Sequence, residues 1–319
     1  MTKHLFAAAT LMIACSSSAV DLKLIPQGTK WIVEADLKAF AGSETGRYLK
    51  QNAAGGVPGE TLVRAFAEET GIDFDKDVAS FVFCGSGAER NTGFMILEGA
   101  WNADTVAGAL PKARNFAARE YGKHVVMSWE SRGPRFASLV DNGLAFFAAD
   151  EAQLLLALDT RDGKKPHAAN DAAFANFNPV AKKPFLILRA RDVNAMAGNN
   201  PQAAALQQTE SVSCLIGEAP ASAGVAVDMA LTALSAEAAT QIATMLQGMQ
   251  AMAQRQGANN ADLLDLTKAF TIASAGRKVN LNGVLRKELV KRLMDNAVRA
   301  RNGNAARGWP APAVPPAFE

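Results

Sequence analysis

The sequence predicts an α+β protein built from two pseudo-repeated, ferredoxin-like halves, with a mostly antiparallel sheet and helices packed on one face. Short apolar runs bounded by glycine or polar residues alternate with stretches of helical periodicity. Two passages of the chain also follow the same order of elements at a constant spacing. We therefore expect the order β-α-β-β-α-β-β-α in each half.

The repeat is clearest at the glycines that bound the predicted strands. Gly85 matches Gly217, and Gly93 matches Gly224. The helix caps Asn102 and Ser235 correspond at the same spacing, about 131 to 133 residues in all three cases. One spacing repeated three times indicates a duplication, and two such halves can join edge to edge so that unpaired strand edges are hidden.

The first half begins with a strand and a helix that Gly71 ends, since a helix often ends at a residue in the left-handed conformation. Asn142 and Gly143 supply the positive φ angles of a tight hairpin, and Asp150 with Gln153 forms a capping box before the last helix. Strands are predicted at residues 31–37, 78–85, 93–100, 116–121, 124–129, 135–140 and 144–148, and helices at 60–70, after Asn102 and after Asp150.

The second half repeats this order without the extra hairpin of the first, which is formed by residues 135–140 and 144–148. Its last helix has one apolar face, made of Leu285, Leu289, Leu293 and Val298. Strands are predicted at residues 185–191, 211–217, 224–231, 270–273 and 278–284, and further helices at 201–208 and 236–256.

Residues 70–80 (TGIDFDKDVAS), between a predicted helix and a strand, resemble a segment of uncharacterised families of exported bacterial proteins with duplicated α+β halves. The resemblance covers the leader and the general plan. It implies export and a similar fold, and it implies no activity because those families lack an established one.

The N-terminus reads as an export signal, with Lys3 and His4 before an apolar run of residues 5–14 and then small residues. Cleavage after Ala19 would free Val20. Alternatively, residues 12–15 resemble a lipobox in which Cys15 becomes lipidated, although Met12 stands where leucine is usual. The protein is therefore expected to be periplasmic or secreted, or else tethered to a membrane as a lipoprotein.

Four segments follow from these patterns. They are an export signal at residues 1–19, a first half at 20–165, a second half at 166–301 and a disordered, proline-rich tail at 302–319.

Composition and motifs exclude several kinds of chemistry. The formal charge of +2 does not indicate bulk binding of a polyanion, and export makes nucleic acid an improbable partner. Outside the leader the chain has two histidines, His124 and His167, which are too few for a histidine-rich metal site. No catalytic residue, cofactor site or metal site is assigned.

Two weaker motifs favour structural roles. Asp73, Asp75 and Asp77 have the alternate spacing of a calcium loop, but Val78 and Cys84 occupy the positions where that loop needs glycine and glutamate, which favours a linker. Cys84 and Cys214 fall on corresponding strands, either as buried free thiols or as a disulfide between the halves.

Two surfaces remain as candidates for binding. Ile242, Met245, Leu246, Met249 and Met252 form a stripe on the helix at 236–256, which either packs on the core or lines an apolar groove. Residues 277–307 contain nine basic and two acidic residues, as a solvated helix face or as a site for an anionic surface.

The sequence thus predicts an exported envelope protein with a non-enzymatic binding or assembly role. An apolar-ligand carrier is its more specific form, and an apolar ligand, an envelope protein or an anionic membrane surface is its possible partner. The alternative is a hydrolase or another enzyme with an unrecognised site.

Overall fold

A computed structural model describes residues 21–52, 60–87, 92–101, 103–131, 133–141, 143–171, 174, 184–197, 204–220, 224–257 and 260–306. The predicted export signal with Cys15, the predicted cap Asn102, the predicted turn residue Asn142 and residues 307–319 lie outside the described residues.

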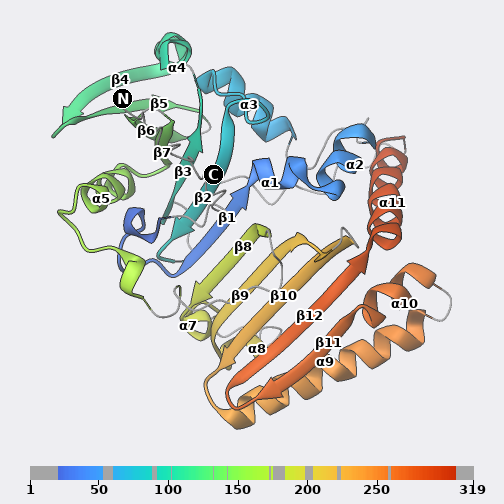
Figure 1. Cartoon of the computed structure of the whole chain (residues 1–319). Coiled ribbons are helices and arrows are strands. Elements are labelled where there is room, and N and C mark those ends of the chain that lie inside the picture. The colour runs from blue at the N-terminus through green and yellow to red at the C-terminus, as the bar shows by residue number, and fades with distance from the viewer. Residues whose placement is uncertain are drawn as a thin grey trace, which may run out of the picture.

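The described strands form one sheet of twelve, in the order β11-β12-β10-β9-β8-β1-β2-β3-β7-β6-β5-β4 (Figure 1). Every pair of neighbours is antiparallel. The strands are β1 (Trp31–Asp36), β2 (Val78–Gly85), β3 (Gly93–Gly99), β4 (Arg114–Tyr121), β5 (His124–Glu130), β6 (Pro134–Asp141), β7 (Leu144–Ala148), β8 (Pro184–Arg191), β9 (Thr209–Glu218), β10 (Gly224–Ala233), β11 (Phe270–Ala275) and β12 (Lys278–Arg286).

The helices between these strands are α1 (Leu37–Gly42), α2 (Glu44–Asn52), α3 (Glu60–Thr70), α4 (Ala103–Ala109), α5 (Glu151–Arg161), α7 (Val193–Ala197), α8 (Ala204–Gln207), α9 (Ala236–Gln256), α10 (Ala261–Lys268) and α11 (Lys287–Ala306). Three short 3₁₀ turns are η1 (Leu22–Leu24), η2 (Leu110–Lys112) and η3 (Ala168–Asn170). The mixture of helices with an antiparallel sheet confirms the predicted α+β class.

The ferredoxin-like strand order expected for each half is not the observed one. A split βαβ unit places parallel strands side by side, and the described sheet contains no parallel pair. Consecutive strands are neighbours instead, with three exceptions. Helices α4 and α9 lead the chain out to the edge strands β4 and β11, and the connection from β7 to β8 returns the chain to the centre of the sheet. The first strands, β1 and β8, pair at the centre, where Val33 lies opposite Leu188.

The expectation of helices on one face is wrong for residues 31–161, where both faces of the sheet are covered. On one face, Leu154 and Leu158 of α5 pack on Ile96 and Phe146. On the other, Val106 of α4 packs with Leu97, Phe147 and neighbouring residues of the same cluster. Alternate residues of β2, β3 and β7 are apolar on both sides, so each side needs its own cover.

Helix α9 covers the sheet from β10 to β11 on the same face as α4. Its residues Ala239, Ile242 and Ala243 pack on Leu231 and Val279. Residues paired directly opposite one another on neighbouring strands point to the same face of the sheet. This face can be followed across successive strands through Val33, Leu188, Cys214 and Met229. We call it the α9 face, and the opposite side the α5 face.

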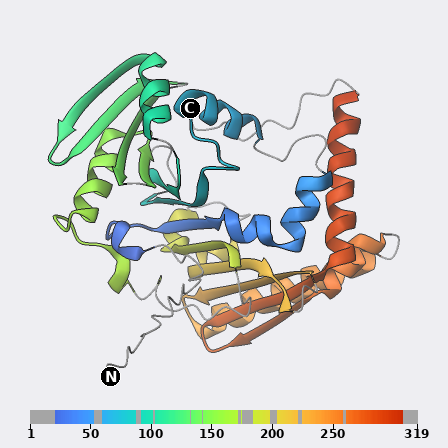
Figure 2. The same ribbon diagram turned by 45° about the horizontal axis from the view of Figure 1, so that its top comes forward.

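At one end of the molecule α2 lies alongside α11 (Figure 2). Lys287 of α11 pairs with Glu44 of α2, and the hydroxyl of Tyr48 donates to Asp295 at 2.9 Å. Helix α11 continues to Ala306, so the start of the predicted tail at residue 302 is wrong. A single glycine, Gly303, costs a helix only about 1 kcal/mol, and proline first follows at residue 310.

The local signals read from the sequence have clear structural counterparts. Gly71 ends α3 with φ of +75°, and Gly143 in the β6–β7 turn has φ of +95°. The side chains of Asp150 and Ser235 accept hydrogen bonds from the backbone N–H groups of Gln153 and Ala238, which caps α5 and α9. No helix in the described part of the chain is long and apolar enough to cross a membrane.

Candidate functional site

The predicted stripe on α9 divides into two groups of residues. Ile242 is buried and Leu246 is partly buried in the core beneath the helix. Met245, Met249 and Met252 are 42%, 57% and 58% exposed. The expectation that all five residues share one surface is therefore wrong, since the methionines lie outside the core-facing stripe.

The side of α9 that carries the methionines follows from helical geometry. Gln247 and Gln250 lie on the flank toward the sheet edge, where Gln250 Nε2 donates to the carbonyl of Phe270 at 2.8 Å. Successive residues of a helix are about 100° apart around its axis. The three methionines therefore lie on the other flank of α9, across the core-facing stripe from Gln247 and Gln250. Because α9 lies over β10, β12 and β11, this flank is turned toward β9.

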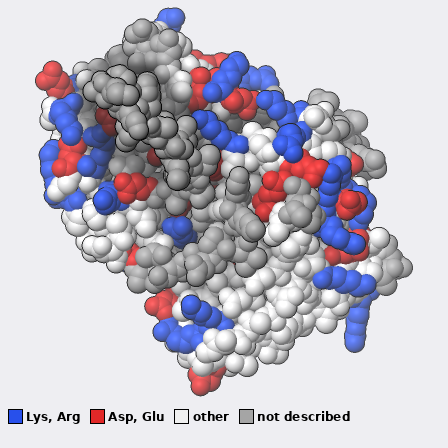
Figure 3. All heavy atoms as spheres, viewed as in Figure 1, with Lys and Arg blue, Asp and Glu red and all other residues white. Residues whose placement is uncertain are grey.

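This surface, which we call the methionine flank, consists of Met245, Gly248, Met249 and Met252. Residues 238–254 contain no charged side chain. Gly248 is exposed, and a Cβ atom added there would meet nothing within 4 Å. Figure 3 shows the molecule from the side of Figure 1, where the surface over β10 and β12 carries few charged side chains.

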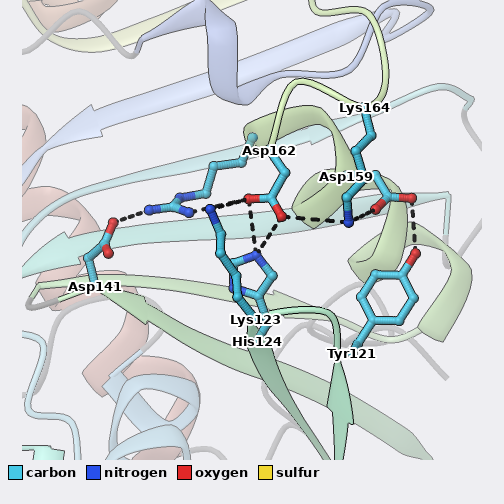
Figure 4. A network of polar contacts seen from close by, with 8 residues as sticks. Tyr121, Lys123, His124, Asp141, Asp159, Asp162 and Lys164 are labelled. Carbon is cyan, nitrogen blue, oxygen red and sulfur yellow. Dashed lines mark hydrogen bonds and ion pairs between the residues drawn. The ribbon is translucent and has the colours of Figure 1, made fainter.

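A second candidate is a polar network between the β4–β5 hairpin and the end of α5 (Figure 4). His124 Nε2 lies 3.1 Å from both carboxylate oxygens of Asp162, and the two side chains are 3% and 7% exposed. Lys123 Nζ is 3.0 Å and Lys164 Nζ is 3.7 Å from the same carboxylate. The position of His124 at the start of a strand, directly after a turn, did not predict such deep burial.

The network extends on both sides of Asp162. Arg161 joins it to Asp141, and Lys164 joins it to Asp159 at 3.2 Å. The hydroxyl of Tyr121 donates to the other oxygen of Asp159 at 3.0 Å. Hydrogen bonding to that carboxylate raises the pKa of Tyr121 above its ordinary value.

The position of Asp162 explains why so many cations surround it. Asp162 is the C-cap of α5, where the partial negative charge of the helix end disfavours a carboxylate. Burial alone would raise the pKa of Asp162, but hydrogen bonds from Lys123 and His124 outweigh burial and lower the pKa. The network thus ties the hairpin to α5.

This arrangement lacks the parts of a nucleophilic site. A histidine–aspartate pair needs a hydroxyl or thiol within hydrogen-bond reach of the imidazole. Tyr121 is the hydroxyl in the network, and it is bonded to Asp159. Beside the network, an open groove is lined by residues including Lys164, Lys165 and His167, but Asp159 and the α5 terminus offset the cations there.

No family model matches the chain, and no curated protein matches it. Two solved structures of the protein TP0453 are similar to it in fold. Crystal form I has a TM-score of 0.46 and 8% identity and covers 88% of this chain and 98% of that chain. Crystal form IV has the same TM-score and identity and covers 87% of this chain and 96% of that chain.

The centre of the sheet holds a buried ion pair that the sequence reading missed. Glu34 of β1 and Arg189 of β8 lie 3.4 Å apart, with side chains 5% and 12% exposed. Both point to the α5 face, on diagonally neighbouring positions of the β1–β8 ladder. Arg189 Nε has no hydrogen-bond partner among the residues that the structure describes. The sequence signal for this ion pair was one charged residue inside each of two otherwise apolar predicted strands, Glu34 in residues 31–37 and Arg189 in residues 185–191.

Cys84 and Cys214 are free thiols, and the alternative of a disulfide between the halves is excluded. Strands β2 and β9 are separated by β1 and β8, which places the two residues about 14 Å apart at the usual strand spacing. Cys84 also points to the α5 face and Cys214 to the α9 face.

The aspartates between α3 and β2 accept hydrogen bonds from backbone groups of the turn in which they lie. Asp73 Oδ1 accepts from the N–H of Asp75 at 3.0 Å, and Asp77 Oδ2 accepts from the N–H of Asp73 at 2.8 Å. Among the described residues, no group of three or more histidine, cysteine or acidic side chains could hold a metal ion. The linker interpretation of this segment is therefore supported.

The basic segment 277–307 is largely paired where its side chains are described. Arg292 bonds Asp262 and Asp265 at 2.6 and 2.7 Å. Arg277 pairs with Glu210, and Lys287 pairs with Glu44. An anionic membrane surface would have to compete with these carboxylates, which weakens the case for it.

Proposed function

We propose that this chain is an exported envelope protein that acts by binding or assembly rather than by catalysis, and that it binds through the methionine flank of α9. The observation that carries the proposal is the row of three exposed methionines on a helix surface without charge. Methionine adapts its shape to a partner, and apolar surface exposed in this way is typical of interaction sites.

The apolar-carrier form of this role has less support. A carrier needs an enclosed apolar cavity, whereas Met245, Met249 and Met252 point outward. The pocket between α2 and α11 has a volume of about 10 Å³, enough for one water molecule at most.

An enzymatic role is the alternative, and the His124–Asp162 pair is its best residue set. That pair is buried and holds a helix end, and the described residues place no free nucleophile beside it. It therefore favours a structural role for the network, and the binding hypothesis is preferred.

We also propose that the two halves descend from one unit. The order of elements supports this, since β1, α3, β2, β3, α4, β6, β7 and α5 correspond to β8, α7, β9, β10, α9, β11, β12 and α11. In this scheme β4 and β5 are an extra hairpin at the sheet edge. Helix α4 and helix α9 then occupy equivalent places, and α9 has been lengthened into a binding surface.

The export part of the proposal is tested by the mass of the purified mature protein. A free N-terminus at Val20 is expected for simple cleavage, and a lipid-modified Cys15 for a lipoprotein. A chain that retains residues 1–19 when isolated from cells would contradict export with cleavage.

The binding part is tested by placing a photo-reactive amino acid at position 249 in cells. The matched control is position 125, because Val125 is an exposed apolar residue of β5 at 50% exposure and lies on another element. Cross-linked products are expected at 249 and not at 125. Equal yields at the two positions would contradict the proposal.

A further inference from the structure

We infer that the open groove beside the β6–β7 turn binds a neutral saccharide, with the ring of Trp101 as its stacking surface and the carboxylate of Asp141 as its hydrogen-bond acceptor. The groove and the methionine flank lie on different elements. The inference therefore goes beyond the proposed function and does not depend on it.

The groove lies where β3 and β6 end. It is lined by residues that include Gly99, Trp101, Leu139, Val140, Asp141 and Gly143. Its volume of about 510 Å³ falls within the range of about 300–1,000 Å³ that is usual for small-molecule sites. The N–H of Gly99 donates to the carbonyl of Gly143 at 2.8 Å, which fixes the β6–β7 turn against the end of β3.

The backbone of β6 is irregular at this groove. The register shifts between Leu139 and Asp141, so Val140 has no partner in the β6–β7 ladder. The β5–β6 ladder ends at Ala137 and leaves Val140 without a ladder partner on that side as well. Bulges of this kind redirect side chains and are frequent beside binding sites.

Trp101 supplies an aromatic ring and a free donor. The indole N–H of Trp31 donates to the carbonyl of Gly87 at 2.7 Å, and that of Trp129 donates to Glu69 at 2.9 Å. The indole N–H of Trp101, which is only half-buried, has no hydrogen-bond partner among the described residues. A buried tryptophan usually pairs its N–H, so this donor is available to a ligand, and the negative face of the ring attracts the C–H bonds of a sugar.

Asp141 supplies an acceptor that is already held in place. Arg161 binds one oxygen of its carboxylate and is fixed in turn by Asp162 at the end of α5 (Figure 4). The other oxygen has no partner in the described part of the chain, and the side chain is 59% exposed. A carboxylate that is ordered before binding loses less conformational entropy when a hydroxyl donates to it.

The charge of the groove favours a neutral ligand. Arg161 compensates the charge of Asp141, so a cation would meet the guanidinium beside the carboxylate, and an anion would meet the carboxylate. A purely apolar ligand would bury the free oxygen of Asp141 without a partner, which is unfavourable. A neutral saccharide has hydroxyl donors for Asp141 and a C–H face for Trp101, and it therefore fits both.

The test is an NMR titration of the ¹⁵N-labelled mature protein with chitotriose and, separately, maltotriose up to about 20 mM. We expect a dissociation constant of about 1 mM, because the groove is open and offers few contacts. The indole N–H signal of Trp101, identified by its loss in Trp101→Phe, is expected to shift. The signals of Trp31 and Trp129 are expected to stay in place, since their N–H groups are already bonded within the fold.

Asp141→Asn is expected to weaken binding about tenfold, because a charged acceptor becomes a neutral one. Glu210→Gln is the matched control and should bind like the wild type. Glu210 also pairs with an arginine, Arg277, but it is 50% exposed on β9 and does not line the groove. Both carboxylates are at least half exposed, so both variants should keep the denaturation midpoint of the wild type.

Three outcomes would overturn the inference. They are a Trp101 signal that does not shift with either saccharide, an Asp141→Asn variant that binds as tightly as the wild type, and tighter binding of the glucosamine trimer than of chitotriose. The glucosamine trimer is the same chain of sugars with free, cationic amines, so the last outcome would indicate a site for cations. The binding function proposed for the methionine flank would stand in each case, because cross-linking at position 249 does not involve the groove.

Discussion

Replacing Asp162 by asparagine tests whether the polar network holds α5 to the β4–β5 hairpin. The substitution keeps the shape of the side chain and removes its charge. His124, 3% exposed, then loses its carboxylate partner, and Arg161, 17% exposed, loses one of two. Lys123 and Lys164 are 64% and 52% exposed and can turn to solvent.

The magnitude follows from these exposures. A hydrogen bond to a charged group contributes about 1.5–3 kcal/mol, which applies to the buried His124 contact. The exposed lysines add less than about 1 kcal/mol each. Removing a negative charge from the C-terminus of α5 gives back about 0.3–1 kcal/mol. The net expectation is a loss of about 2–3 kcal/mol in the free energy of unfolding.

Urea denaturation at pH 7 measures this loss, with Asp141→Asn as the matched control. Asp141 also pairs with Arg161, but its side chain is 59% exposed, so its replacement should cost less than about 1 kcal/mol. Equal effects of the two substitutions would refute the reasoning, because burial would then not decide the strength of these contacts.

The pH dependence gives an independent check. The pKa of Asp162 is lowered in the folded protein, so its contribution is complete above the unfolded pKa of about 3.9 and is lost as pH falls through the folded pKa. The difference between the wild type and Asp162→Asn should therefore shrink below about pH 4. A difference that keeps its full size well below about pH 4 would contradict this assignment.

Three further substitutions or reagents test other parts of the structure. Gln250→Ala should cost about 1–2 kcal/mol by freeing two backbone carbonyls, and light scattering on heating should reveal earlier aggregation; unchanged scattering would argue against a protected edge. Gly143→Ala should lower the denaturation midpoint more than Gly163→Ala does. Both glycines have positive φ, but only at Gly143 would an added Cβ lie 2.2 Å from a backbone oxygen, that of Gly99, and equal midpoints would contradict this. Thiol labelling of the native protein should modify Cys214 before Cys84, whose burial raises its pKa; the reverse order would contradict the packing.

The sequence predicts strands and capped helices well where a local signal sets their limits. Predicted boundaries match α3, β2 and α9 residue for residue, because Gly71, Gly85 and Ser235 mark real changes in backbone conformation. The helices α1, α2, α7 and α10 were missed. Helix α2 has a polar sequence, and its position depends on contacts with α11 that are distant along the chain.

The pairing of the halves shows the limit of matching by sequence. Gly85 was aligned with Gly217, yet Gly85 lies on the α9 face and Gly217 on the α5 face. A strand shifted by one residue presents its other face, so equivalent positions must differ by an odd number of residues between β2 and β9. Glycine marks the strand ends and not their faces, so the matched glycines do not give the register of the proposed repeat.

The two edges of the sheet are protected in different ways, and this bears on how the chain could assemble. The edge strand β4 carries Arg114, Arg119 and Glu120, and its register shifts near Asn115, which has φ of +54°. The other edge strand, β11, has no charge, and Gln247 and Gln250 of α9 bond its backbone carbonyls instead. Assembly by strand addition is thus opposed at both ends. The same helix that closes one edge leaves Met245, Met249 and Met252 exposed on its other flank.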